Sequence, residues 1–120
     1  MKLVTLNQEQ FDRYAKNHRY RSFYQTTAYG NSMLKFGYNV HYFGIVDKNN
    51  SLIGATMIMY KAVFMNNKIA YAPRGILFDY SDSQKVKELA ECLKSLLGKQ
   101  GFMLLRMDPY IPISIHSNDG

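Results

Sequence analysis

The chain has 120 residues, of which 47% are hydrophobic and 20% are charged, so it is long enough for one compact domain with its own core. This composition excludes a disordered, collagen-like or coiled-coil chain. Fifteen Lys and Arg residues stand against nine Asp and Glu, which gives a net charge of +6. Eight of the basic and three of the acidic residues lie within residues 1–61, so a cationic face is expected from the first half. Such a face favours anionic partners, although ordinary solubility charge explains the same excess.

Cysteine and histidine usage argues against a disulfide framework or a metal site. Cys92 is the single cysteine, and His18, His41 and His116 are scattered without the spacing of metal ligands. We therefore expect no metal. The sequence also lacks a signal-peptide core and an apolar run long enough to cross a membrane, so we expect a cytoplasmic protein.

The first elements are a short strand and a capped helix. Lys2–Leu6 alternates polar and apolar residues, as a strand does. Asn7 and Gln10 then form a capping-box pattern, and the apolar spacing predicts a helix that continues to His18. Four basic residues follow this helix and its exit: Arg13, Lys16, Arg19 and Arg21.

A second helix is predicted to begin near Thr26 or Thr27 and to end at Gly37. Tyr29, Met33 and Phe36 are spaced by four and three residues, so they share one face of this helix.

The middle of the chain predicts an antiparallel sheet. Val40–Val46 and Leu52–Phe64 are strand-like and are separated by the polar turn 47–50, which is a hairpin pattern. A turn at Asn66-Asn67 leads to a third strand, Lys68–Ala72, which ends at Pro73 because proline cannot donate to a strand ladder.

After an irregular segment, Arg74–Asp82, a second capping-box pattern at Ser81 and Gln84 predicts a long helix, with Gly98 following its last turn. Its apolar residues recur at helical spacing: Val86, Leu89, Ala90, Leu93, Leu96 and Leu97. Phe102–Met107 is then a nearly continuous apolar run, typical of a buried parallel strand.

The predicted element order is β-α-α-β-β-β-α-β within one domain covering residues 1–120. A strand reached through a helix returns parallel to its partner, so the sheet is mixed and the fold class is α/β (α+β). This order resembles the first part of the acyl-CoA N-acyltransferase (GNAT) fold. The turn after the third strand, Arg74-Gly75-Ile76-Leu77, holds only one glycine, so the backbone cradle that acyl-CoA needs is missing.

Three residues are candidates for a binding or catalytic site. Arg74 follows a strand end, where a guanidinium can bind an anion, or it can pair with Asp79 or Asp82. Asp108 follows the last strand, where it can accept a proton or cap the turn before Pro109. Lys35 lies among aromatic residues and is otherwise an ordinary solvated charge at a helix end.

Three segments resemble the FemA/FemB/FemX (FemABX) family of aminoacyl-tRNA-dependent peptidoglycan transferases. They are Phe23-Tyr24-Gln25-Thr26-Thr27, Arg74-Gly75 with Asp79-Tyr80, and Asp108-Pro109-Tyr110-Ile111-Pro112. The resemblance extends over nearly the whole chain. Family members are considerably longer and contain two acyltransferase-like subdomains, so the chain is expected to be an N-terminal part of the first subdomain and inactive by itself.

The resemblance implies an aminoacyltransferase that moves an amino acid from aminoacyl-tRNA to the stem peptide of a peptidoglycan precursor, to build the interpeptide bridge. The precursor is lipid-linked or UDP-linked muramyl pentapeptide, aminoacyl-tRNA is the co-substrate, and no cofactor is needed. Lys35, Arg74 and Asp108 match precursor-binding positions, and Asp108 also matches an aspartate near the acceptor amine. Such enzymes work in the cytoplasm or at the inner face of the membrane.

Two other classes of function stay open. The basic residues of the first helix suit a non-catalytic module that binds RNA or another polyanion, although no RNA-binding motif accompanies them. The element order also suits a small acetyl-CoA-dependent N-acetyltransferase, against which the missing glycine-rich turn argues.

Overall fold

The computed structural model describes residues 1–64, 67–99 and 102–107. Its helices and strands, in chain order, are β1 Lys2–Thr5, α1 Gln8–Lys16, the 3-10 helix η1 Phe23–Gln25, α2 Thr27–Lys35, β2 Asn39–Val46, β3 Leu52–Phe64, β4 Asn67–Ala72, β5 Leu77–Phe78, α3 Ser83–Lys99 and β6 Phe102–Met107. The predicted order is confirmed, with the two-residue strand β5 as an addition.

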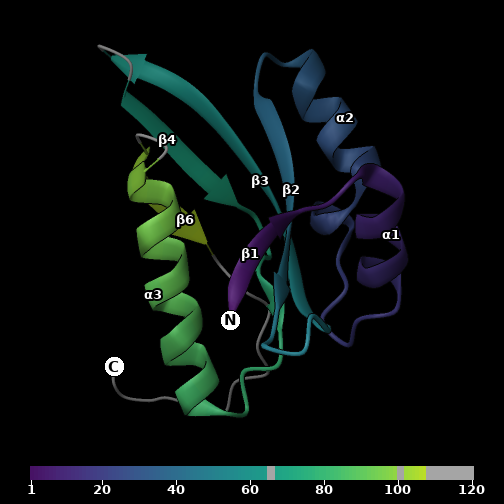
Figure 1. The fold of residues 1–120 in the computed structure, drawn as a ribbon. Coiled ribbons are helices and arrows are strands. Elements are labelled where there is room, and N and C mark those ends of the chain that lie inside the picture. The colour runs from purple at the N-terminus through teal and green to yellow at the C-terminus, as the bar shows by residue number, and fades with distance from the viewer. Residues whose placement is uncertain (65–66, 100–101, 108–120) are drawn as a thin grey trace, which may run out of the picture.

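One mixed sheet forms the centre of the molecule. Its strand order is β1-β2-β3-β4-β6, and β5 pairs with β3 beside this path. Neighbouring strands run antiparallel except β4 and β6, which are parallel as the crossover through α3 predicted. Helices α1 and α2 lie on one face of the sheet and α3 lies on the other (Figure 1).

Each face of the sheet has its own core. Under α1 and α2, Phe11 is fully buried and its ring centroid lies 4.9 Å from that of Tyr42. Under α3, the buried side chains of Leu89 and Leu93 pack with Ile45 from β2. Alternate residues of a strand point to opposite faces, so the same strands supply both cores.

The predicted helix capping is confirmed for α1 but not for α3. The predicted capping box of α1 is confirmed, because Asn7 accepts from the backbone N–H of Gln10 at 2.8 Å and Gln10 accepts from that of Asn7 at 2.9 Å. His18 lies beyond the end of α1, which stops two residues earlier. The predicted start of α3 is wrong by one residue, since Asp82 and not Ser81 accepts from the first turn.

Two details of the predicted helices are wrong. Gly98 lies inside α3, which continues to Lys99, so it is not the residue that ends the helix. Ala90 is exposed although its spacing placed it on the inner face.

In α2 the predicted end is confirmed: the helix stops at Lys35, and Gly37 follows with a φ of +90°, which glycine adopts without strain.

Candidate functional site

Two of the sequence motifs meet at the side chain of Gln25. This residue ends η1 and is fully buried. Its carboxamide oxygen accepts from the backbone N–H of Met57 at 2.8 Å, and its nitrogen donates to the carbonyl oxygens of Met57 at 3.3 Å and of Pro73 at 2.8 Å. Gln25 therefore joins the 23–27 motif to the turn that carries Arg74.

The Gln25 carboxamide fills a gap in the sheet. Along one edge of β3, pairing with β4 extends as far as Met59, and pairing with β5 extends from the other side as far as Ala55. Met57 lies between these two paired stretches, and Gln25 supplies its donor and its acceptor. A buried backbone group needs such a partner, so the side chain replaces a missing strand at this point.

Gly75 packs directly against this carboxamide. A Cβ atom at Gly75 would lie 2.9 Å from the Gln25 nitrogen and 2.7 Å from the hydroxyl oxygen of Thr56, which is itself fully buried. Both approaches are closer than a real Cβ tolerates. The glycine of the Arg74-Gly75 pair is thus required by close packing. Arg74 itself is exposed and has a positive φ of 55°.

The second half of the same motif closes this turn. The Tyr80 hydroxyl donates to the carbonyl oxygen of Ile76, and burial raises the pKa of Tyr80 to about 12. The exposed Asp79 accepts from the backbone N–H of Ser81 at 3.0 Å and from its hydroxyl at 2.7 Å, which lowers the pKa of that carboxyl. Both side chains therefore hold the loop that follows Arg74.

Lys35 lies at the other end of α2. It is the last residue of the helix and is exposed. The ammonium nitrogen of Lys61, from β3, lies 4.3 Å from the centroid of the Tyr38 ring, three residues beyond Lys35. Lys61 carries no local sequence signal, because only the pairing of β2 with β3 brings it to this end of the molecule.

The structure does not place Lys35 beside Arg74. Arg74 follows Pro73, which bonds to Gln25 just before α2 begins, whereas Lys35 ends α2. Helix α2 is about 12 Å long at 1.5 Å per residue, and Lys35 stands at the end away from Gln25. Asp108 lies outside the described residues. Strand β6 ends opposite Ala72, so β4 and β6 finish at the same edge of the sheet.

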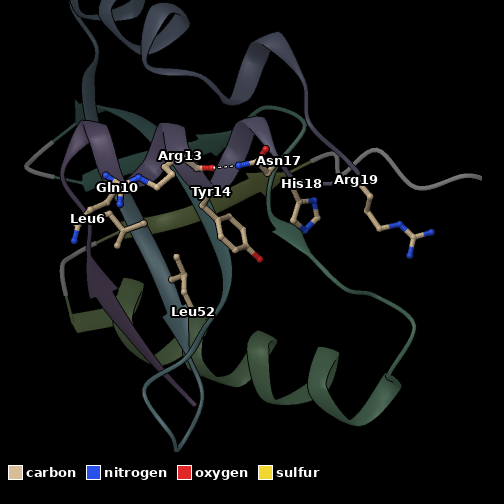
Figure 2. A pocket seen from close by; sticks show the side chains of 8 residues that line it. All are labelled: Leu6, Gln10, Arg13, Tyr14, Asn17, His18, Arg19 and Leu52. Carbon is tan, nitrogen blue, oxygen red and sulfur yellow. Dashed lines mark hydrogen bonds between the residues drawn. The ribbon is translucent and has the colours of Figure 1, made fainter.

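Neither Lys35 nor Arg74 lines the cavity shown in Figure 2, which has a volume of about 640 Å³. There the Tyr14 ring extends from α1 between Leu52 and His18, and the Arg19 side chain points away from it. His18 accepts from the backbone N–H of Tyr20 at 3.1 Å. Burial first, and Arg19 second, lower the pKa of His18, whereas Asp79 opposes this shift.

The four basic residues of the first helix and its exit do not share one cavity. Arg13 and Arg19 line the one in Figure 2, while Lys16 and Arg21 line another of about 600 Å³ between α1 and η1. Arg13 also lies 3.7 Å from Glu9 in an exposed ion pair.

Within residues 1–64, 67–99 and 102–107, no group of three His, Cys, Asp or Glu side chains could hold a metal ion. The same part of the chain contains no helix with the length and apolarity to cross a membrane.

Comparison with known proteins adds a family and a fold. The model of the FemAB family matches residues 6–120. A curated relative, Aminoacyltransferase FemA of Staphylococcus aureus, is 29% identical over all 120 residues. The chain spans 29% of that relative's length.

The structural neighbours share the fold. A crystal structure of FemX superposes with a TM-score of 0.77 at 18% identity, covering 92% of this chain and 28% of FemX. A probable acetyltransferase gives a TM-score of 0.59 at 13% identity, covering 96% of this chain and 83% of its own. Glucosamine-6-phosphate N-acetyltransferase from Arabidopsis thaliana gives 0.51 at 12% identity, with 92% and 82% covered. The GNAT-like mixed sheet expected from the element order is thereby confirmed.

Proposed function

Because the chain belongs to the FemAB family, we propose that it forms the precursor-binding part of an aminoacyltransferase that extends the interpeptide bridge of peptidoglycan. The observation that carries the proposal is the contact between the 23–27 motif and the turn that carries Arg74. Gln25 and Gly75 pack into one hydrogen-bonded unit that presents Arg74 at a strand end. Since loops at strand ends commonly carry binding residues, this unit suits an anionic ligand.

The ligand that we propose is the muramyl pentapeptide precursor, whose pyrophosphate carries the negative charge. Arg74 and Lys35 are both exposed cations, Arg74 in the turn after β4 and Lys35 at the C-terminal end of α2. An extended sugar-peptide would contact the two side chains with different parts of its length. Lys61 adds a third positive charge near Lys35.

The reaction that we propose is aminolysis of an ester. The acceptor amine attacks the carbonyl carbon of the aminoacyl ester, an amide bond forms, the ester C–O bond breaks, and the tRNA hydroxyl leaves with a proton. The amine must first lose its ammonium proton, and Asp108 is proposed to orient it or to accept that proton. An ester is already activated, so positioning supplies much of the rate and no cofactor is required.

The co-substrate, aminoacyl-tRNA, would be bound mainly by residues beyond this chain, since the chain spans 29% of its FemA relative. We propose that these 120 residues are the first part of the first subdomain and have no transfer activity of their own. Aminoacyl-tRNA and precursor are both made in the cytoplasm, so the reaction is proposed to occur there or at the inner face of the membrane.

An NMR titration tests the binding proposal. The isotope-labelled chain is titrated with soluble UDP-muramyl pentapeptide and, in parallel, with acetyl-CoA. We expect shifts at the amides around Lys35 and Arg74 with the muramyl ligand alone. Lys35→Ala and Arg74→Ala should each weaken binding, whereas Lys87→Ala removes the same charge from the exposed face of α3 and should not.

A response to acetyl-CoA alone would instead indicate an N-acetyltransferase, and the absence of any response would refute the precursor site on this chain. Binding of RNA that survives both substitutions would favour the polyanion-binding module.

A further inference from the structure

Large hydrophobic side chains are exposed on one segment of the molecule. Within the described part of the chain, four such side chains stand out, and all come from η1, α2 and the residue after it: Phe36 at 70% exposure, Phe23 at 61%, Leu34 at 49% and Tyr24 at 45%. Together with Lys35 and Lys61, we name these residues the α2 surface. A cluster of exposed apolar side chains of this kind marks an interaction site more often than chance does.

The aromatic part of this surface is ordered. The rings of Phe23 and Tyr24 meet that of Tyr29 edge-on, with centroids 5.6 and 5.0 Å apart. Tyr29 and Met33 are half-buried and pack against the core. Tyr29 therefore links the exposed rings of Phe23 and Tyr24 to the core, and α2 lies at the margin of the fold beside the start of β2 (Figure 1).

Two cations accompany the apolar side chains at the C-terminal end of α2. Residues 13–46 contain no Asp or Glu but five Lys and Arg, of which Lys35 stands between Leu34 and Phe36 in the sequence. Lys61 reaches the same end of α2 from β3 and lies over the Tyr38 ring. At the other end of α2, the half-buried Asp12 accepts from the backbone N–H of Thr27 at 3.1 Å. An exposed apolar surface next to cations, as at the C-terminal end of α2, is complementary to a bilayer of anionic lipids.

We propose that the α2 surface docks on an anionic lipid bilayer. Phe23, Tyr24 and Phe36 enter the boundary between headgroups and acyl chains, where aromatic rings are favoured. Lys35 and Lys61 place their ammonium groups among the lipid phosphates while their methylene stems cover apolar surface. Because apolar side chains project at both ends of α2, the helix lies along the plane of the membrane.

The consequence for catalysis rests on the proposed function. Docking through the α2 surface holds Lys35 at the level of the headgroups. The pyrophosphate of a lipid-linked precursor lies at the same level, so the favoured acceptor is the lipid-linked one. Membrane docking itself is measured without any precursor, and its failure would leave the transferase proposal unaffected.

The absence of tryptophan from the chain allows a site-specific test. Phe36→Trp places one fluorophore on the α2 surface. Asn49→Trp, in the exposed turn between β2 and β3, places one at the opposite end of β2. Each variant is mixed with vesicles of phosphatidylcholine alone and with vesicles that also contain phosphatidylglycerol. We expect the emission of the Phe36→Trp variant to shift to the blue with the anionic vesicles only, and that of the Asn49→Trp variant to stay unchanged.

Binding by vesicle sedimentation then separates the contributions. Phe36→Ser should weaken partitioning into the vesicles about ten-fold, because it removes an aromatic ring whose transfer from water into the bilayer is favourable. Lys35→Ala should weaken it about five-fold, and the charge-matched Lys87→Ala on α3 should have no effect. Circular dichroism spectra of the variants should match that of the wild type, since the substituted residues are exposed.

Three results would overturn the proposal. One is the absence of a shift with anionic vesicles, and another is an equal shift at position 49. The third is a shift at position 36 that appears without vesicles and rises with protein concentration, which would assign the α2 surface to a second copy of the chain.

Discussion

Replacing Gln25 by Ala should destabilise the protein strongly, although Gln is a polar residue in a helix of only three residues. The substitution removes all three hydrogen bonds of the carboxamide. The carbonyl of Met57 keeps a partner, the Thr56 hydroxyl at 3.1 Å, but the N–H of Met57 and the carbonyl of Pro73 lose theirs. Each orphaned group costs about 1–3 kcal/mol, so we expect a loss of about 2–6 kcal/mol.

Urea denaturation of the 120-residue chain measures this loss from the change in midpoint at an unchanged slope. Gln84→Ala is the matched control, because it makes the same substitution at an exposed position of α3 and should change the free energy of unfolding by less than about 0.5 kcal/mol. The amide resonances of Arg74 and Gly75 should move in the Gln25 variant and stay in place in the control.

Gln25→Glu is a second test of the role of the carboxamide, because it keeps the acceptor and removes the donor. The carboxylate still accepts from Met57 but donates to neither carbonyl, and it buries a charge, which raises the pKa of the new carboxyl. A raised pKa means that the cost is largest at high pH and is relieved as the carboxyl gains a proton, so this variant should approach the wild type as pH falls. If Gln25→Ala costs less than about 1 kcal/mol, or if Gln25→Glu shows no such pH dependence, the carboxamide does not hold the turn as described.

The packing around two glycines and one half-buried imidazole gives three more predictions. A Cβ at Gly30 would lie 2.3 Å from the Tyr42 hydroxyl oxygen, a buried atom without a hydrogen-bond partner in the described structure, so Gly30→Ala should cost about 1–3 kcal/mol alone and much less in a Tyr42→Phe background. Equal costs in both backgrounds, measured by urea denaturation, would refute this contact. Gly75→Ala should lower the thermal midpoint by an amount equivalent to about 2 kcal/mol or more, because its Cβ displaces the Gln25 carboxamide. The pKa of His18 is lowered from 6.5, so below that pH the unfolded chain binds more protons than the folded one, and stability should fall as the pH drops below about 6.5. The thermal midpoint of His18→Gln should depend less on pH in this range than that of the wild type. An unchanged dependence on pH would show that His18 is not the group responsible.

Local patterns in the sequence determined most of the elements. The capping box at Asn7 and Gln10 needs only residues three apart, and the hairpin needs only alternation on both sides of a polar turn. The parallel pairing of β6 followed from a long amphipathic helix between two apolar runs. Such features depend on contacts between near neighbours, so a single sequence contains them.

The remaining features depend on contacts between residues far apart in the chain. Phe36 shares its helical face with Tyr29 and Met33 by spacing, yet it is 70% exposed because it follows the last residue of α2 and lies beyond the core under that helix. Strand β5 has two residues, too few for a periodicity, and exists because β3 leaves an edge to pair with. Gln25 gave no sign of being structural, since its partners lie 32 and 48 residues away. Only the assembled sheet leaves Met57 without a strand partner on the side away from β2, and a buried backbone group must find a partner elsewhere.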